Sequence, residues 1–356
     1  MTVTVNTGIA SPQISYSVLR SFVPLARLSD EQLDLLLAHA MCVNVYQGQE
    51  VVRVGDATPS HIYLLHGSLI CGRTHTEEAQ FIHTGEPLSF APIAHEFPRK
   101  VSVIAETDCS ILKVDSDFLE KLLCWGQVSR CLLAEIALDD AYAADYFWIK
   151  KLLESKLFYK VPPTNIRSIL HKFRELPVRA DDAVILEGEE GSCCYLIKSG
   201  VAEVFINAHG EEPVASLSAG AVFGEDALVT QNPRNASVIM HSDGVLLKLE
   251  KKDFYELLRQ PEVSIVTAGN VPAFLQSGAV LLDVRSQKEF ELAHHPKALN
   301  FPLHLAYLKS ALLDKNSQYI TCANASERAR AAAVLLTEQG FNAHALQSDW
   351  HALERF

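Results

Sequence analysis

The stretch GAVFGEDAL at residues 220–228, followed after four residues by PRNASV at residues 233–238, carries the strongest local signal in the chain. Glycine at position 224 lets backbone N–H groups approach an anion, and a short helix beginning near Glu225 would add its positive dipole end. Arg234 supplies a guanidinium fork that suits a phosphate group. The Glu225 carboxylate does not suit a phosphate, but it suits a neighbouring sugar hydroxyl as a hydrogen-bond acceptor. The stretch therefore predicts a site for a phosphate that has a sugar beside it.

This stretch resembles the phosphate-binding cassette of cyclic nucleotide-binding domains, the family of the kinase regulatory subunit and the bacterial catabolite activator. The resemblance implies that Glu225 bonds the ribose 2′-hydroxyl and that Arg234 pairs with the cyclic phosphate. Backbone amides near Ala227 and Asn235 would complete the cradle, and Ser237 would touch the base. Because Ser237 is compatible with either base, the expected ligand is cAMP or cGMP. The ligand-binding residues implied by the resemblance are Phe223, Gly224, Glu225, Asp226, Ala227, Arg234, Asn235 and Ser237.

Two positions depart from the usual pattern of that family. Asp226 stands where a hydrophobic residue is more usual, and Asn235 stands where alanine is common. Both residues are small and polar enough to keep the cradle. The alternative to a ligand site is an ordinary turn of a β barrel, with a surface ion pair between Glu225 and Arg234.

A second copy of the same unit precedes this one. Residues 98–118 lie over residues 233–254 with a shift of 135, and the two glycines at 55 and 67 match those at 188 and 200 with a shift of 133. A repeat of this length decides the fold of the whole chain. In both copies short runs of apolar and β-branched residues alternate with glycine or aspartate turns, which is typical of all-β barrels.

The repeat predicts a multidomain α+β protein. We expect residues 1–125 and residues 159–260 to form two jelly-roll β barrels of the cyclic nucleotide-binding type, each with flanking helices. Residues 126–158 contain no proline and place apolar residues at helical intervals, so they are expected to form a helical connector.

The first copy keeps little of the cassette. Over the same positions it has Ser89 for the glycine, Phe90 for the carboxylate and Pro92 for an amide donor, and it keeps Arg99. The cradle would thereby lose an acceptor and at least one donor. We therefore expect the first barrel to be degenerate, with a structural role or a role in forming a homodimer, and Arg99 to form an external ion pair. Weak anion binding by this barrel is the alternative.

After Gln260 the chain changes in character. The run VLLDVR at residues 280–285 is typical of a buried parallel strand, and a second short strand at residues 318–321 leads directly into Cys322. A helical pattern follows over residues 327–339. A cysteine between the carboxyl end of a strand and the amino end of a helix is where free amides and the helix dipole lower a thiol pKa. Cys322 is therefore a candidate nucleophile.

Residues 261–356 resemble a rhodanese-like domain, an α/β fold with a parallel sheet. The resemblance implies that Cys322 attacks a sulfur donor and carries the sulfur as a persulfide to a thiol acceptor, while Arg328 and the loop amides hold the donor anion. The loop at residues 322–328 lacks glycine, and its C-x5-R spacing looks like the phosphatase branch of the same superfamily. Sulfur transfer, phosphatase or arsenate-reductase chemistry, and a catalytically silent domain all stay open.

The composition limits the other partners. The 356 residues carry a formal charge of −12, which repels nucleic acid backbones and anionic lipids alike. No apolar run approaches the length of a membrane span, and the first residues lack the pattern of a secretory signal, so we expect a cytoplasmic protein. Three histidines in the last domain fall at a turn and not at helical spacing, so no metal is expected.

Together these patterns predict a sensor of cAMP or cGMP. The second barrel would bind the ligand, and the short connection between Gln260 and Val280 would pass its effect to the rhodanese-like domain. The alternative is a nucleotide-binding interaction protein without catalysis.

Overall fold

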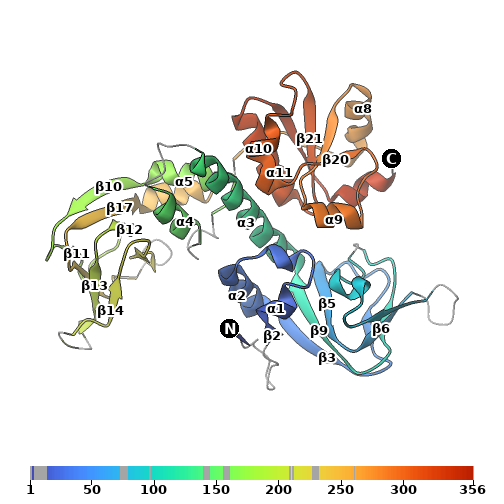
Figure 1. The fold of residues 1–356 in the computed structure, drawn as a ribbon, viewed down its shortest axis with the longest axis horizontal. Helices are drawn as coiled ribbons and strands as arrows, with labels where there is room; N and C mark the ends of the chain where they lie inside the picture. Colours follow the sequence, from blue (N-terminus) through green and yellow to red (C-terminus); the bar gives the residue numbers. More distant parts are fainter. Residues whose placement is uncertain are drawn as a thin grey trace. The chain divides into compact units, whose positions relative to one another are not determined.

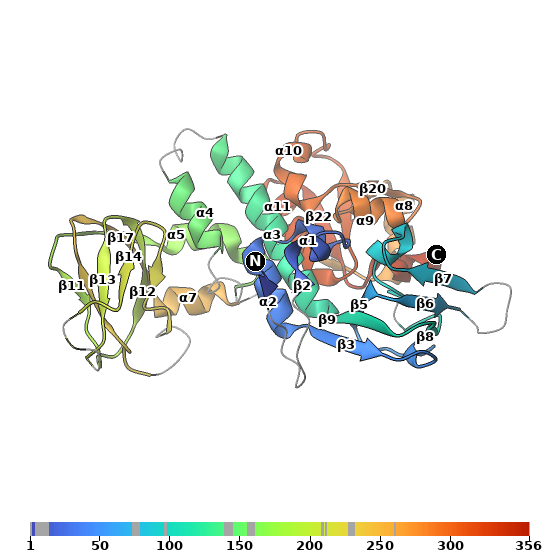
Figure 2. The same ribbon diagram turned by 60° about the horizontal axis from the view of Figure 1, so that its bottom comes forward.

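The computed structural model describes residues 2–3, 14–72, 79–95, 98–138, 145–154, 161–207, 210, 212–226, 232–259 and 261–355. These residues form two compact units (Figures 1 and 2). The first unit combines Met1–Gln127 with Val263–Phe356, and the second unit is Val128–Glu262. The chain therefore leaves the first unit, builds the second, and returns to the first. Each unit is described by itself below.

The N-terminal part of the first unit contains two antiparallel sheets. One has the order β3-β9-β5 and the other has the order β4-β8-β6-β7. The strands are β3 (Met41–Val45), β4 (Glu50–Val52), β5 (Ser60–His66), β6 (Ser68–Cys71), β7 (Gln80–His83), β8 (Val103–Ala105) and β9 (Cys109–Asp115). A short pair, β1 (Thr2–Val3) and β2 (Ile14–Ser15), precedes them. Apolar side chains from both sheets form one buried cluster between them.

Helices flank these sheets on either side in the sequence. They are α1 (Tyr16–Leu19), η1 (Leu25–Arg27) and α2 (Asp30–His39) before the sheets and the long α3 (Ser116–Ala137) after them, while the 3₁₀ turn η2 (Pro87–Phe90) lies between β7 and β8. A capping box between Ser29 and Gln32 begins α2, and the buried Gln32 side chain donates to the Leu122 carbonyl of α3 at 2.9 Å. That bond holds α2 against α3, the helix that follows the last strand of the N-terminal β domain.

The second unit also contains two antiparallel sheets, with the orders β10-β17-β12-β15 and β11-β16-β13-β14. The strands are β10 (Arg174–Val178), β11 (Ala183–Ile185), β12 (Cys193–Ser199), β13 (Ala202–Phe205), β14 (Ala215–Leu217), β15 (Val222–Phe223), β16 (Ser237–Met240) and β17 (Gly244–Glu250). The helices of this unit are α4 (Tyr146–Glu154), η5 (Pro163–Asn165), α5 (Ile166–Lys172) and α7 (Lys251–Leu257). An apolar cluster again fills the space between the sheets.

The two β domains share their strand order. The order β3-β9-β5 matches β10-β17-β12, and β4-β8-β6-β7 matches β11-β16-β13-β14. They also share a tight turn, in which Gly67 of the first domain and Gly200 of the second have φ of 98° and 99°. A Cβ at Gly67 would lie 2.6 Å from the Asp108 carbonyl oxygen, so this turn requires glycine.

The C-terminal part of the first unit is an α/β domain, as expected. Its sheet has the order β18-β22-β21-β19-β20, and every strand pair is parallel. The strands are β18 (Ile265–Val266), β19 (Val280–Asp283), β20 (Ala298–Asn300), β21 (Gln318–Cys322) and β22 (Asn342–Leu346). Helices and 3₁₀ turns connect them: η7 (Ala268–Asn270), α8 (Val271–Gln276), α9 (Gln287–Leu292), η8 (Leu303–Leu305), α10 (Ala306–Ser310), α11 (Ser326–Glu338) and η9 (Trp350–Arg355).

Helices cover both faces of this parallel sheet, and Figure 1 shows α10 and α11 on one side and α8 on the other. Side chains of β21 alternate between the two faces. Thr321 donates its hydroxyl to the Ala329 carbonyl of α11, whereas Ile320 and Cys322 join an apolar cluster with Val271 of α8 and Trp350 of η9. The face to which Cys322 points is therefore the α8 side of the sheet.

Within the described part of the chain, no helix is both long enough and apolar enough to cross a membrane.

Candidate functional sites

The cassette expected from the sequence lies in the second unit, at the end of β15. Phe223 is 5% exposed and pairs with Tyr195 of β12, against which its ring stacks at 5.3 Å. Gly224 follows with φ of 73°. An added Cβ there would lie 2.7 Å from Arg234 Nη1 and 2.8 Å from Ile185 Cδ1. Both the backbone conformation and the space therefore require glycine beside the Arg234 guanidinium.

Two backbone carbonyls hold Arg234. Its Nη1 donates to the Gly224 carbonyl and its Nη2 donates to the Cys193 carbonyl, each at 2.7 Å. Its own backbone pairs with the turn before β12, since Gly188 N donates to the Arg234 carbonyl and Arg234 N donates to the Glu189 carbonyl, both at 2.8 Å. The guanidinium is thus fixed beside the glycine turn. The ion pair with Glu225 that an ordinary surface turn would have is not among the salt bridges of the described residues.

The other expected ligand-binding residues lie between Glu225 and Ser237 in the sequence. Glu225 is partly buried, and burial together with the charge of Asp226 raises the pKa of its carboxyl, against the opposing effects of its own amide and Arg234. Asn235 is exposed and donates to the Asp226 carboxylate at 3.1 Å. The Ser237 hydroxyl accepts from the backbone N–H of Glu187 at 2.9 Å. Ala227, the remaining residue of the expected set, lies outside the described residues.

The first unit holds a similar arginine, Arg99. The alignment of the two repeats in the sequence assigned the wrong residues to the positions of Gly224 and Glu225. Arg99 is 2% exposed and donates to the carbonyls of Ala94 and Ser60, as Arg234 donates to those of Gly224 and Cys193. Ala94 also has a positive φ of 46°, and Ile93 N donates to the Ile62 carbonyl at 2.8 Å. The counterpart of Gly224 is therefore Ala94.

Ser89 and Phe90, which the sequence comparison set against Gly224 and Glu225, lie in η2 instead. The physical reason is that the segment before the arginine is shorter in the first unit than in the second. Four residues separate Ala94 from Arg99, whereas nine separate Gly224 from Arg234. The five missing residues fall within the segment that carries Asp226 and Ala227 in the second unit, so the shift of 135 holds only after this gap.

Cys322 is at the end of β21 as expected, but its environment contradicts the expectation of a stabilised thiolate. The side chain is 0% exposed and belongs to the apolar cluster with Ile320, Leu346 and Trp350. Burial raises the pKa of the Cys322 thiol well above its ordinary value, and the nearby Asp283 raises it further. Desolvation of the thiolate outweighs any stabilisation by the following helix.

Arg328 also lies elsewhere than expected. Its guanidinium is 0% exposed and bonds two carboxylates, Glu120 of α3 at 2.7 and 2.8 Å and Glu289 of α9 at 2.9 and 3.1 Å. It therefore ties the α/β domain to the helix that ends the N-terminal β domain. The role of holding a donor anion beside Cys322 does not fit this geometry, because its hydrogen bonds go to the two carboxylates.

The loop after Cys322 is held from the inside. Asn324 Oδ1 accepts from Arg285 Nη1 at 2.8 Å and from Trp350 Nε1 at 3.0 Å. Arg285 also pairs with Asp283 at 2.6 Å, and both of these side chains are nearly fully buried. The guanidinium of Arg285 lies over the Trp350 ring at 4.7 Å. Protein groups thus occupy the interior of the loop.

Sequence reasoning missed the two carboxylates that hold Arg328. Glu289 carried a signal, because Ser286 followed three residues later by glutamate predicts a capping box, and both of its hydrogen bonds are present. Glu120 lies on an apolar helix face, where a charged residue indicates burial with a partner but does not identify that partner. The pairing spans 208 residues of sequence, so no local pattern could have indicated it.

A buried histidine near the contact of Arg328 with Glu120 and Glu289 makes the stability of the first unit depend on pH. His61 of β5 is 7% exposed, its Nδ1 is 2.8 Å from Ser116 Oγ, and burial lowers its pKa from 6.5 to about 3. A depressed histidine pKa stabilises the fold above pH 6.5, and that stability is lost as the pH falls toward 3.

We therefore expect the wild-type first unit to lose about 2–3 kcal/mol of stability between pH 6.5 and pH 4.5 through His61, and His61→Phe to remove that slope. Glu289 does not contribute in this window. Burial would raise its pKa, but Arg328 and Ser286 hold it at about 2 from an ordinary 4.5. Urea unfolding at several pH values measures the slope, with exposed His39→Gln as the control. An equal slope in His61→Phe and wild type would contradict the assignment.

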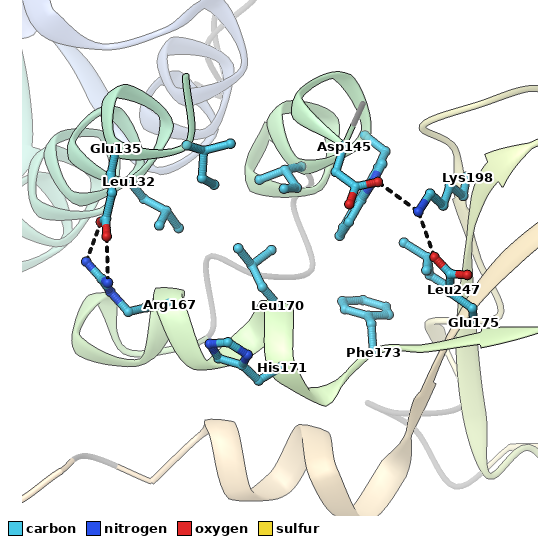
Figure 3. A pocket seen from close by; sticks show the side chains of 13 residues that line it. Leu132, Glu135, Asp145, Arg167, Leu170, His171, Phe173, Glu175, Lys198 and Leu247 are labelled. Atoms are coloured by element: carbon cyan, nitrogen blue, oxygen red, sulfur yellow. Dashed lines mark hydrogen bonds and ion pairs between the residues drawn. The ribbon is translucent and has the colours of Figure 1, made fainter. Parts of the chain in front are cut away.

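The second unit contains a cavity of about 260 Å³ between α3, α4, α5 and the strands β10, β12 and β17. Figure 3 shows that charged pairs lie at its two ends, Arg167 with Glu135 and Lys198 with Asp145 and Glu175. The side chains between the pairs are apolar except for His171. Because these charges already bond one another, the cavity offers mainly apolar surface. The described residues also contain no group of three or more histidine, cysteine, aspartate or glutamate side chains that could hold a metal ion.

Two family descriptions match the chain, "Cyclic nucleotide-binding domain" over residues 175–261 and "Rhodanese-like domain" over residues 267–355. The regulatory subunit of cAMP-dependent protein kinase from Aspergillus niger is 31% identical over 131 residues, which are 37% of this chain and 32% of that relative. The corresponding subunit from Hypocrea atroviridis is 26% identical over 262 residues, which are 69% of this chain and 52% of the relative. The chain thus spans about a third to a half of the length of these curated relatives.

Solved structures give similar matches. The regulatory domain of Toxoplasma gondii PKA with cAMP has 19% identity and a TM-score of 0.28, covering 73% of this chain and 93% of that chain. A cyclic nucleotide-binding-like protein from Brucella abortus has 23% identity and a TM-score of 0.29, covering 32% of this chain and 97% of that chain. The family matches identify a cyclic nucleotide-binding domain in the second unit, followed by a C-terminal rhodanese-like domain.

Proposed function

We propose that the second unit binds a cyclic nucleotide at Gly224, Glu225 and Arg234. The observation that carries the proposal is the fixed guanidinium of Arg234 beside a turn where only glycine fits. The cyclic phosphate would replace the Gly224 and Cys193 carbonyls as the acceptor for Arg234, which exchanges two neutral acceptors for a charged one. The Glu225 carboxylate would accept the ribose 2′-hydroxyl.

The first ligand to test is cAMP, because the named relatives are regulatory subunits of cAMP-dependent kinases. Calorimetric titration of the whole chain with cAMP and cGMP measures the affinity of each. Linear 5′-AMP is the control, because it carries a different phosphate geometry and charge. Saturable binding of a cyclic nucleotide at one site per chain supports the proposal. If neither cyclic nucleotide binds better than 5′-AMP, the second unit is not a cyclic nucleotide sensor.

We also propose that the N-terminal β domain is a degenerate copy of the same domain. The shared strand order and the shared arginine–carbonyl contacts support common descent. The gap of five residues before Arg99 removes the segment that would cradle a phosphate. Its role is then structural, because α3 brings Glu120 to Arg328 of the rhodanese-like domain.

For the rhodanese-like domain we propose a role without catalysis. Sulfur transfer would need a reachable Cys322 thiolate to take the outer sulfur of a donor such as thiosulfate, with sulfite leaving. The buried Cys322 side chain and its raised pKa oppose that step. Phosphatase or arsenate-reductase chemistry would need the guanidinium that Glu120 and Glu289 already bind. The chain is then a nucleotide-binding interaction protein.

We expect Cys322 to stay unmodified while Cys42 and Cys71 are alkylated. Both of the latter are partly exposed, whereas Cys322 is enclosed. Mass spectrometry after limited iodoacetamide treatment measures the three sites. In parallel, the rate of sulfur transfer from thiosulfate to cyanide should be the same for wild type and Cys322→Ser, with or without cAMP. Rapid labelling of Cys322, or a wild-type rate that Cys322→Ser abolishes, would establish sulfur transfer instead.

A further inference from the structure

A second cavity lies within the first unit, between the N-terminal β domain and the rhodanese-like domain. Its volume is about 290 Å³. One wall comes from β5, β7 and residues 91–95, and the other comes from α9 and the loop after Cys322. We call it the composite cavity, because each domain supplies only part of its lining. Its size approaches the lower end of the range for small-molecule sites.

The charged groups that line the composite cavity are already neutralised. Arg285 pairs with Asp283 at 2.6 Å and also donates to Asn324 and to the Ala293 carbonyl. Glu289 pairs with Arg328 at 2.9 Å. A charged ligand would therefore lose its hydration without gaining a free counterion, and that loss is expensive in a partly apolar cavity. An uncharged ligand is favoured.

Two polar groups in the lining do have unused hydrogen-bonding capacity. His61 is 93% buried, and its Nδ1 contacts Ser116 Oγ, while its Nε2 makes no hydrogen bond to a described residue. Asn324 Oδ1 accepts from two groups that can only donate, Arg285 Nη1 and Trp350 Nε1, which fixes the orientation of the amide. The two N–H groups of Asn324 Nδ2 make no hydrogen bond to a described residue.

A ligand that hydrogen-bonds these two groups would replace the water that otherwise solvates them, so the cavity favours a ligand with matching polar atoms. Asn324 Nδ2 can only donate, and it therefore matches a carbonyl oxygen or a ring nitrogen. His61 Nε2 takes either role according to its tautomer. The lining also includes the apolar side chains of Pro24, Ile82 and Leu292, which suit a flat apolar ring.

We propose that the composite cavity binds a small uncharged aromatic ring that bears an amide or lactam group. The ring carbonyl accepts from Asn324 Nδ2, and the ring packs between the apolar walls with a polar edge at His61 Nε2. The proposal goes beyond cyclic nucleotide binding, because the site lies in the other unit and excludes a phosphate. It also gives the degenerate β domain a function, since Ile93 and Ala94 line the cavity where the second unit has Phe223 and Gly224.

The test compares two matched pairs of probes on the unmodified full chain. The first pair is uncharged nicotinamide and nicotinate, which has a carboxylate in place of the amide. The second pair is uncharged uracil and orotate, which is uracil with an added carboxylate. Ligand-observed NMR at millimolar concentrations measures binding of all four compounds. At least one uncharged member should bind at least tenfold more tightly than its charged partner. Absence of binding by both uncharged probes, or equal binding of the acids, overturns the proposal.

Variants then locate the bound probe. Asn324→Asp keeps an acceptor for Arg285 and Trp350 but removes the donor to the ligand, so binding should weaken at least tenfold. Ala91→Phe fills the cavity and should abolish binding, whereas exposed Asn316→Asp in the same domain should leave it unchanged. Arg234→Ala should also leave probe binding unchanged, which separates this site from the cyclic nucleotide site. Undiminished binding in Ala91→Phe places the probe elsewhere and overturns the proposal.

Discussion

Arg328→Ala is expected to lower the free energy of unfolding of the first unit by about 3–5 kcal/mol. Arg328 is fully buried between Glu120 and Glu289, which are 2% and 5% exposed. Removal of the guanidinium leaves two carboxylates close together without a cation, in a place from which water is excluded. Burial raises the pKa of Glu120 even though Arg328 lowers it, so the charged carboxylate would be less stable still without the guanidinium. The loss exceeds what an exposed ion pair contributes, about 0–1 kcal/mol.

Urea unfolding followed by hydrogen–deuterium exchange of the α3 and α11 peptides measures this loss in the first unit alone. Arg330→Ala is the matched control, because Arg330 is on the same helix and is partly exposed. Its effect should stay below about 1 kcal/mol. Glu120→Gln should produce a smaller loss than Arg328→Ala, since it removes one charge and keeps an acceptor for Arg328. Equal stability of Arg328→Ala and Arg330→Ala would show that the buried pair contributes nothing.

Arg234→Ala is expected to weaken cyclic nucleotide binding about 100-fold or more, equivalent to about 2.8 kcal/mol. The variant removes the guanidinium that lies beside Gly224, and the phosphate would lose its charge-assisted hydrogen bonds. Calorimetric titration with cAMP measures the change. Arg179→Ala, an exposed arginine of the same unit, should keep the wild-type affinity.

A second variant distinguishes loss of the Arg234 charge from displacement of the Arg234 guanidinium. Gly224→Ala keeps Arg234 but places a methyl group 2.7 Å from its Nη1, so the guanidinium must move. We expect a loss of roughly tenfold in affinity. Gly210→Ala is the control, because Gly210 lies in the same unit and its φ is also positive at 82°, but nothing lies within 4 Å of the added Cβ. If Arg234→Ala binds cAMP as wild type does, the ligand does not use this cassette.

The placement of Arg234 beside Gly224 could be predicted from the sequence because the contact is local. Gly224, Glu225 and Arg234 lie within eleven residues, and the conformation that they need is set by one turn and one strand pair. The parallel sheet of the C-terminal domain was predictable for the same reason, since buried strands read as continuous apolar runs.

What the sequence could not predict depends on contacts between distant segments. Ala94 looked unrelated to Gly224, because only its φ and the hydrogen bond from Arg99 reveal the five-residue gap. Cys322 looked like a nucleophile from its position between strand and helix. Only the fold shows which face of the sheet its side chain lies on. Only the fold shows that Trp350 packs on that face.

The discontinuous first unit has a consequence for the order in which the protein folds during synthesis. Glu120 meets Arg328 only after 208 further residues have been made, and the whole second unit lies between them. Closure of so long a flexible loop carries an entropic cost, and that cost falls when the intervening segment has already collapsed into a folded body. We therefore expect prior folding of the second unit to lower the entropic cost of joining the two halves of the first unit. Until α11 has been synthesised, the Glu120 face of α3 stays uncovered, and this nascent state is the one that a chaperone would meet.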